Sequence, residues 1–238
     1  MRRRALRRSL ACLALVLLLL TGLAAHSILR VPQVYSGLTV PTGPERRKLS
    51  GEFMSGVNEM METIRASGDG RWQETFSADQ MNSYFEEDFL RARPFRLPDG
   101  IHSPRVRIDR DHFTLAFRYG HGFWSTVVCV EMNLWLVAGE RNVVAIEFLG
   151  LHAGAVPISL QSHLEQLAES ARQLSIEVTW YRRGGNPVAL LRLQADQENP
   201  TVVIQKLELQ DGKLVVAGKS NEAAPLRTML SRMDGGVR

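Results

Sequence analysis

The chain has 238 residues, 45% of them apolar and 23% charged, which are the proportions of a folded protein and not of a disordered one. Its net charge of +4 comes from the N-terminus, where five arginines at positions 2, 3, 4, 7 and 8 precede any acid. Removing these five charges leaves −1 for residues 9–238. The basic balance is therefore no evidence for nucleic-acid binding, and we expect no nucleic-acid partner.

An uncharged apolar run follows the arginines, from Leu10 to Leu29 with one polar interruption near its end. A run of about 20 residues is long enough to cross a bilayer as a helix. A cleaved signal peptide is the alternative, but its best cleavage sequence, at residues 22–24, is a poor match. The sequence therefore favours a transmembrane signal anchor at residues 9–30. It predicts a single-pass protein of the inner (cytoplasmic) membrane, with residues 1–8 in the cytoplasm and the C-terminal domain periplasmic or otherwise extracytoplasmic.

The segment after the anchor is expected to be a stalk and then two helices. Residues 31–44 contain three prolines and two glycines, which predicts an extended stalk. Pro44 suits the first turn of a helix, and apolar residues recur at helical spacing toward residue 66. Ser77 begins a second helix with a capping-box pattern. The acidic run Glu86–Asp88 is expected to be a solvated face and not a metal site, because adjacent helical residues do not share a face.

Most of the remaining chain predicts antiparallel strands joined by short loops. The longest apolar stretch, residues 123–139, predicts a strand of roughly 50 Å at about 3.3 Å per residue. One of its faces, from Trp124 to Leu136 in steps of two, is almost entirely apolar and is expected in the core, whereas the other face is mixed. A helix is expected from Pro157 to about Gln173, because its leucines recur at spacings of four and three. The other strands are expected at 105–110, 113–119, 143–151, 176–182, 188–194, 201–209 and 214–217. Asp211-Gly212 predicts a hairpin turn between the last two.

Strands that do not alternate with helices predict an α+β domain and argue against a doubly wound parallel sheet. The exported domain is expected at residues 45–220, and a flexible tail at 221–238. Of the two cysteines, Cys12 lies in the apolar run. Cys129 therefore has no partner for a disulfide within the exported domain, and we expect it to be an inert strand residue.

The sequence contains no pattern typical of catalysis, metal binding or a cofactor. Its six histidines lie outside any His-x-x-x-His, Cys-x-x-Cys or Gly-x-Ser-x-Gly context. The acid–histidine cluster Asp109–His112 falls where a hairpin turn is expected. We therefore expect no cofactor, no metal and no enzymatic activity, and a hydrolase with residues dispersed along the chain stays open as an alternative.

Two short motifs and the order of the elements resemble a known group of proteins. The motifs are Phe76-Ser-Ala-Asp-Gln-Met-Asn82, after the first helix, and Gly154-Ala-Val-Pro-Ile158, before an amphipathic helix. With the anchor and the β-meander, they resemble the small membrane-anchored YpmS-like and LmeA-like proteins of bacterial envelopes, which are related in shape to tubular lipid-binding (TULIP, BPI-like) domains. The segments Pro104-Arg-Val106 and Asn142-Val-Val-Ala145 are also similar to strands of exported proteins of planctomycete-type bacteria. The resemblance covers about residues 45–220. It implies a long curled antiparallel β-meander wrapped on an amphipathic helix, with an apolar groove for acyl chains.

Two functional hypotheses follow. The first is an anchored, exported domain that binds or shields a lipid or another apolar ligand at the outer face of the membrane, without catalysis. The alternative is a bitopic envelope scaffold that docks a protein partner through a sheet edge or its first helix. An internal apolar cavity would favour the first hypothesis, and an exposed patch of Phe53, Val57, Met60 and Met61 would favour the second. The side chains expected to line a ligand site are Trp124, Val128, Met132, Leu134, Phe148, Leu160, Leu164 and Leu167.

Overall fold

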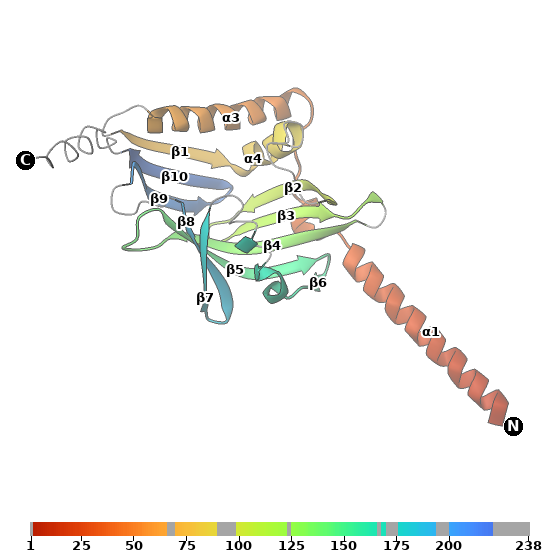
Figure 1. Ribbon diagram of the computed structural model, residues 1–238. Helices are drawn as coiled ribbons and strands as arrows, with labels where there is room; N and C mark the ends of the chain where they lie inside the picture. Colours follow the sequence, from red (N-terminus) through yellow and green to blue (C-terminus); the bar gives the residue numbers. More distant parts are fainter. Residues whose placement is uncertain are drawn as a thin grey trace, which may run out of the picture.

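The structure is a computed structural model that describes residues 2–65, 70–89, 99–122, 125–165, 168–169, 176–193 and 200–220. Within these residues the protein is α+β, with an apolar N-terminal helix, a second long helix and a large antiparallel sheet (Figure 1). The coarse fold class predicted from the sequence is therefore confirmed.

The N-terminal helix α1, Arg2–Leu29, projects away from the domain (Figure 1). In the described chain one segment, Leu15–Ser36, is long and apolar enough to cross a membrane, and the protein buries none of its most apolar window. This finding is consistent with the predicted single-pass anchor. The other helical elements are α2 (Gln33–Ser36), α3 (Pro44–Arg65), α4 (Ala78–Tyr84), the π-helical turn η1 (Phe85–Phe89) and the 3-10 turn η3 (Leu160–His163).

The strands form two antiparallel sheets. The small sheet has the order β1–β10–β9, and the large sheet has the order β2–β3–β4–β5–β8–β7, with β6 added on β5. The small sheet consists of β1 (Arg71–Ser77), β9 (Val202–Gln210) and β10 (Lys213–Ser220). The large sheet consists of β2 (Ile101–Ile108), β3 (Phe113–Tyr119), β4 (Thr126–Leu136), β5 (Val143–Ala153), β6 (Val156–Pro157), β7 (Glu177–Arg183) and β8 (Asn186–Arg192).

Local sequence signals account for the start of several elements. Pro44 is the first residue of α3, as predicted. Ser77 caps α4 through a full capping box, in which its hydroxyl accepts from the Gln80 amide at 3.1 Å and the Gln80 side chain accepts from the Ser77 amide at 2.9 Å. The β9–β10 turn is the predicted Asp-Gly hairpin, with Gly212 at φ +74°, a conformation that favours glycine.

The main core forms where α4 and the small sheet cover β2 and β3, while α3 runs along β1 on the outside (Figure 1). Burying each large apolar side chain contributes about 1.5–3 kcal/mol. This cluster therefore holds the helices, the small sheet and one end of the large sheet together. Its buried members are Phe76, Met81, Val106 and Ile108, and the side chains packed around them include Phe53, Val57, Phe113, Leu115, Leu209 and Leu214.

Strand β4 is shorter than predicted. It has 11 residues, which corresponds to roughly 36 Å at about 3.3 Å per residue. Its predicted C-terminal part, residues 137–139, instead enters the hairpin to β5, where Gly139 has φ +84°. Residues 123–124 lie outside the described residues.

The prediction of which face of β4 is buried is wrong for the first half of the strand. Val127 and Cys129 on the mixed face are 1% and 5% exposed, whereas Val128 on the apolar face is only half-buried. The reason is that the chain after α1 folds back over the mixed face, where Tyr35 packs against Ala116, Val127 and Cys129.

That same segment differs from the extended stalk expected at residues 31–44. It includes α2, and the Tyr35 hydroxyl donates to the Ser103 carbonyl at 2.9 Å. The Arg118 guanidinium lies 5.6 Å from the centre of the Tyr35 ring. Residues 31–38 are therefore held against the sheet by an aromatic anchor.

The prediction that Glu86–Asp88 form a solvated face is also wrong. All three acids lie in η1, and Glu87 is only 6% exposed. Each carboxylate has a partner outside η1, two of them on α3 and one on β2. The partners are Arg105 for Glu86 (2.6 Å), Arg46 for Glu87 (2.7 Å) and the Ser50 hydroxyl for Asp88.

The helix predicted from Pro157 to about Gln173 is described only in part. The described residues form η3 and short helical pieces at 164–165 and 168–169. Residues 166–167 and 170–175 lie outside the described residues, as does the tail predicted at 221–238.

Candidate functional site

One face of the large sheet carries an almost unbroken set of apolar side chains, which we call the apolar sheet face. Opposite residues in antiparallel strands share a face, and the strand register places Phe117 opposite Val128, Val130 opposite Leu151 and Met132 opposite Phe148. A second row crosses the sheet from Leu134 through Ile146 and Ala189 to Trp180. The apolar sheet face thus consists of Phe117, Val128, Val130, Met132, Leu134, Ile146, Phe148, Leu151, Trp180 and Ala189.

The apolar sheet face is only partly covered by the described chain. Met132 and Ala189 are buried, whereas Phe117, Val128, Val130 and Phe148 are half-buried. The small sheet packs near the Met132 end, where Phe113 joins the main core. The half-buried members extend from Phe117 on β3 across β4 and β5 to Trp180 on β7.

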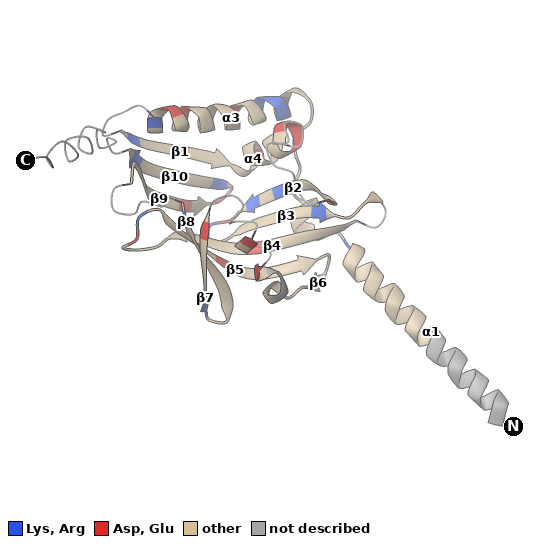
Figure 2. Ribbon diagram, viewed as in Figure 1, with Lys and Arg blue, Asp and Glu red and all other residues tan. Residues whose placement is uncertain are grey.

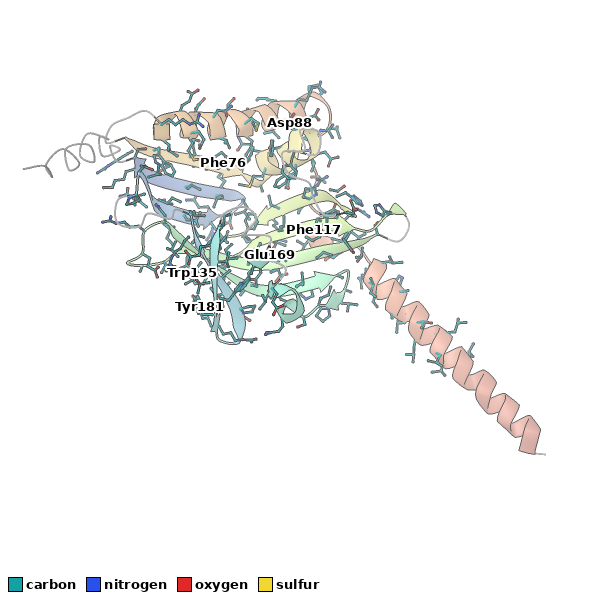
Figure 3. The ribbon with its side chains drawn as sticks, in the orientation of Figure 1. Phe76, Asp88, Phe117, Trp135, Glu169 and Tyr181 are labelled. Carbon is teal, nitrogen blue, oxygen red and sulfur yellow. The ribbon has the colours of Figure 1, made fainter. Side chains whose placement is uncertain are left out.

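An open hollow adjoins this face. It has a volume of about 640 Å³ and is lined by Trp180 on β7 and by five residues of the segments 161–165 and 168–169, with Glu169 shown in Figure 3. Trp180 stacks on Phe148, with ring centres 5.9 Å apart, so the hollow continues the apolar sheet face. The Arg182 guanidinium donates to the Gln161 side chain, which fixes the first turn of the segment to β7. The lining combines apolar and polar side chains: Gln161, Leu164, Glu165, Ala168, Glu169 and Trp180.

The predicted ligand-lining residues fall into three groups. Four of them, Val128, Met132, Leu134 and Phe148, lie together on the apolar sheet face. Leu160 and Leu164 are half-buried on the neighbouring segment, and Leu164 lines the hollow. Trp124 and Leu167 lie outside the described residues. Trp180 is not among the eight side chains selected from the sequence as ligand-lining, although it is an adaptable aromatic that shares one face of its strand with Val178.

The mixed face of β4 brings together the strongest candidates for a dispersed hydrolase. Cys129 lies opposite His152, and Glu131 follows two residues later on the same face. Burial, and then the charge of Glu131, raise the pKa of the Cys129 thiol. A nucleophilic cysteine needs the opposite shift, because the thiolate is the reactive form. Among the described residues, no three His, Cys, Asp or Glu side chains are placed to hold a metal ion.

A second carboxylate on the mixed face has a structural role. Glu147 is buried on β5, and its two oxygens accept from Asn133 at 3.3 Å and from Asn186 at 3.1 Å. These hydrogen bonds tie β4, β5 and β8 together, and the Arg183 guanidinium 3.8 Å from the carboxylate balances its charge.

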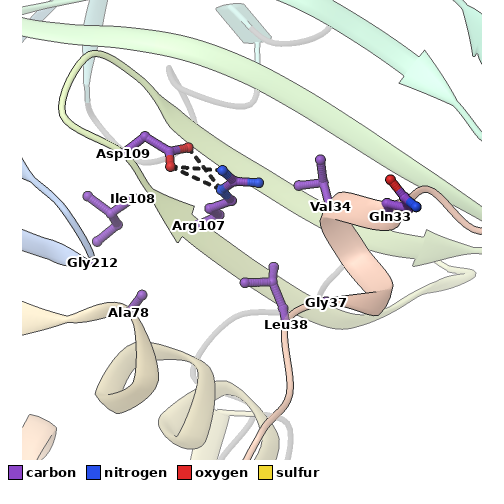
Figure 4. A pocket seen from close by; sticks show the side chains of 9 residues that line it. All are labelled: Gln33, Val34, Gly37, Leu38, Ala78, Arg107, Ile108, Asp109 and Gly212. Atoms are coloured by element: carbon purple, nitrogen blue, oxygen red, sulfur yellow. Dashed lines mark hydrogen bonds and ion pairs between the residues drawn. The ribbon is translucent and has the colours of Figure 1, made fainter.

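The Asp109–His112 segment forms the β2–β3 hairpin turn, as predicted. Asp109 pairs with Arg107 at 3.0 Å and with His112 at 3.4 Å. In Figure 4 the Arg107–Asp109 pair faces Val34 and Leu38 across a hollow of about 280 Å³ between α2 and β2. Because the charges there already neutralise each other, this hollow offers no free acid or base for catalysis.

Phe53 and Val57 do not contribute to the exposed apolar patch that would favour the docking hypothesis. Phe53 packs against Phe76 and Tyr84, with ring centres 5.2 and 4.9 Å apart, and Val57 belongs to the core. Met61 is exposed, together with Met54 one heptad earlier. The surface of α3 thus presents two separate methionines.

No family model, curated protein or solved structure matches this chain. The resemblance to YpmS-like and LmeA-like proteins therefore stays a prediction. The residues of its first motif have structural roles here, since Phe76 lies in the core, Ser77 caps α4 and the Asn82 side chain bonds to the backbone of Val106.

Proposed function

We propose that this protein is a membrane-anchored domain that binds or shields a lipid or another apolar ligand, without catalysis. The observation that supports this most strongly is the apolar sheet face, whose side chains at Phe117, Val128, Val130 and Phe148 are left half-buried by the described chain. A hollow of about 640 Å³ continues that face beyond Phe148 and Trp180. Known small-molecule sites have volumes of about 300–1,000 Å³.

The chemistry of the lining favours an amphipathic ligand. An acyl chain lying on the apolar sheet face would gain about 0.8 kcal/mol for each CH₂ group that it buries. The opposite wall of the hollow carries Gln161, Glu165 and Glu169, which suit a polar head group or water. The indole N–H of Trp180 is buried and has no hydrogen-bond partner in the part of the chain that the structure describes. A ligand oxygen there would remove an unpaired-donor penalty of about 1–3 kcal/mol.

The orientation of the anchor and the TULIP-like shape of the domain belong to the same proposal. The five arginines before α1 favour a cytoplasmic N-terminus and an exported domain at the inner membrane, by the positive-inside rule. A curled sheet with one apolar face fits the TULIP-like architecture implied by the resemblance. The alternative function, docking of an envelope protein, is favoured by Met54 and Met61, because exposed methionines adapt to partner surfaces.

Quenching of Trp180 fluorescence by a brominated fatty acid tests the proposal. Bromine quenches only on close approach, so an acyl chain in the hollow should quench Trp180. We expect a saturable loss of emission in the parent protein that is strongly reduced in Trp180→Phe. In Trp72→Phe, which removes a buried indole of the small sheet, the saturable component should remain. An unquenched parent protein, or equal quenching in both variants, would favour the docking alternative.

A further inference from the structure

The last turn of α1 is joined to the domain by its own backbone carbonyls. The Ala155 amide donates to the Ser27 carbonyl at 2.9 Å, and the Thr126 hydroxyl donates to the Ile28 carbonyl at 2.5 Å. Carbonyls in the last turn of a helix have no partner within the helix. Here the β5–β6 turn and the first residue of β4 supply the donors.

Gly154 makes this close approach possible. It has φ +58°, and a Cβ atom at this position would lie 2.2 Å from the Ile28 carbonyl oxygen. Any other residue would force α1 and the β5–β6 turn apart. A second attachment lies a few residues later, where Tyr35 packs on the mixed face of the sheet. Two attachments on either side of Arg30 fix the direction in which α1 leaves the domain.

The length of the apolar run sets the distance between the domain and the bilayer. A hydrocarbon core of about 30 Å is crossed by about 20 helical residues. The run from Leu10 to Leu29 supplies this length and no more. Ser27 and Ile28 then lie at the outer boundary of the core, so the strand ends bonded to them lie at the level of the lipid head groups.

The chemistry of these strand ends suits that position. The sequence has no Asp or Glu between residues 113 and 130 or between residues 148 and 164, and Figure 2 shows β3 and β6 without acidic residues. Anionic head groups therefore meet no nearby carboxylate in these segments. Tyr119, which lies opposite Thr126, is 52% exposed. Tyrosine is enriched at membrane–water interfaces because its ring is apolar and its hydroxyl is polar.

We propose that the α1 end of the large sheet, residues 119–122, 125–126 and 154–158, is seated on the lipid head groups of the bilayer that α1 crosses. The partner is the lipid surface itself. This inference depends on α1 crossing a membrane and not on the presence of a bound ligand. The half-buried pair Phe117 and Val128 lies one step inside this end, so the apolar sheet face begins at the bilayer surface.

Photo-crosslinking of the full-length chain in vesicles of phosphatidylcholine and phosphatidylglycerol tests the seating. The photoreactive residue p-benzoylphenylalanine is placed at position 119, at the exposed end of β3 next to the apolar sheet face, or at position 121, an exposed residue that follows β3. The control is position 193, where Leu193 is 43% exposed and its amide donates to the Asn142 carbonyl. That site lies at the other end of β4, roughly 33 Å away at about 3.3 Å per residue.

We expect lipid adducts at positions 119 and 121, at several times the yield found at position 193. An adduct at position 119 alone would overturn the seating, because it would report lipid on the sheet face only. Equal yields at all three positions, or no adduct in fully inserted protein, would overturn it as well.

The docking of α1 is tested by a pair of glycine variants in the same crosslinking experiment. Gly154→Ala should lower the adduct yield at position 121 several-fold, because the new Cβ displaces the Ile28 carbonyl. Gly139→Ala is the matched control, since Gly139 also has positive φ but no atom lies within 4 Å of the added Cβ. If Gly154→Ala does not fold, Thr126→Val removes only the hydroxyl bond and should lower the yield less. An unchanged yield in a folded Gly154→Ala or Thr126→Val protein would contradict the role of this contact.

Discussion

Replacing the buried Asn82 by alanine should destabilise the domain much more than replacing an exposed asparagine. Asn82 is 2% exposed, and its side chain acts as a short stretch of strand along the free edge of β2. Its amide nitrogen donates to the Val106 carbonyl at 2.9 Å, and its oxygen accepts from the Val106 amide at 2.7 Å. Val106 is itself buried, so water cannot replace these bonds.

The size of the effect follows from those two bonds. Each contributes about 0.5–1.5 kcal/mol net, and a buried backbone group left unpaired costs about 1–3 kcal/mol. We therefore expect Asn82→Ala to lower the free energy of unfolding by about 2–4 kcal/mol, which is a large part of the roughly 5–15 kcal/mol typical of a domain.

Urea denaturation of residues 31–238, followed by circular dichroism, measures this change. Asn58→Ala on α3 is the control, because Asn58 is exposed and surface changes of this kind are usually within about 0.5 kcal/mol. Asn82→Asp keeps the acceptor and loses the donor, so it should be destabilised as well. If Asn82→Ala and Asn58→Ala unfold at the same urea concentration, the two bonds to Val106 do not hold the β2 edge.

Three further predictions concern stability and reactivity. Ser77→Ala removes the capping box of α4 and should cost about 1 kcal/mol in the same urea experiment, whereas Ser77→Asp should restore most of it. Asn142→Ala should cost about 2 kcal/mol, because the Asn142 side chain bonds to the backbone of Val202 and Ile204 on β9, at 2.6 and 2.8 Å. Its φ of +56° also disfavours alanine. An unchanged urea midpoint would refute this. Burial raises the pKa of Cys129, so folding favours the protonated thiol. The contribution of this thiol to the free energy of unfolding is complete at neutral pH and is lost as the pH rises through the raised pKa. Cys129→Ala should reduce this loss of stability at alkaline pH. In the parent protein, Cys129 should be alkylated much more slowly in the folded state than in the urea-unfolded state.

Local signals predicted the parts of the fold that short segments determine by themselves. Pro44 and Ser77 mark helix starts through their own backbone geometry and side-chain bonds, and both predictions are confirmed. The Asp211–Gly212 turn is likewise local, since it needs only a glycine at positive φ. Val128, Met132 and Leu134 share one face because side chains alternate along β4, and Phe148 joins them through its pairing with Met132.

The sequence could not predict features that depend on distant segments. Strand β1 was missed because its pairing partner, β10, lies about 140 residues later, and its own apolar residues are only Trp72 and Phe76. The buried face of β4 was predicted wrongly in its first half because Tyr35 folds back onto it, and a period-two pattern does not record what covers each face. The three acids of η1 were expected in solvent because their partners Arg46, Ser50 and Arg105 come from other elements.

Native mass spectrometry of residues 31–238, exported and purified without detergent, tests the proposed ligand binding most directly. We predict a reproducible adduct of lipid mass that is lost on extraction with organic solvent. Leu164→Glu, which places a charge in the hollow, should lose the adduct, and Leu193→Glu, on an exposed site outside it, should keep the adduct. A bare protein mass in every preparation, with the chain folded, would contradict lipid binding and favour a scaffold that docks another protein.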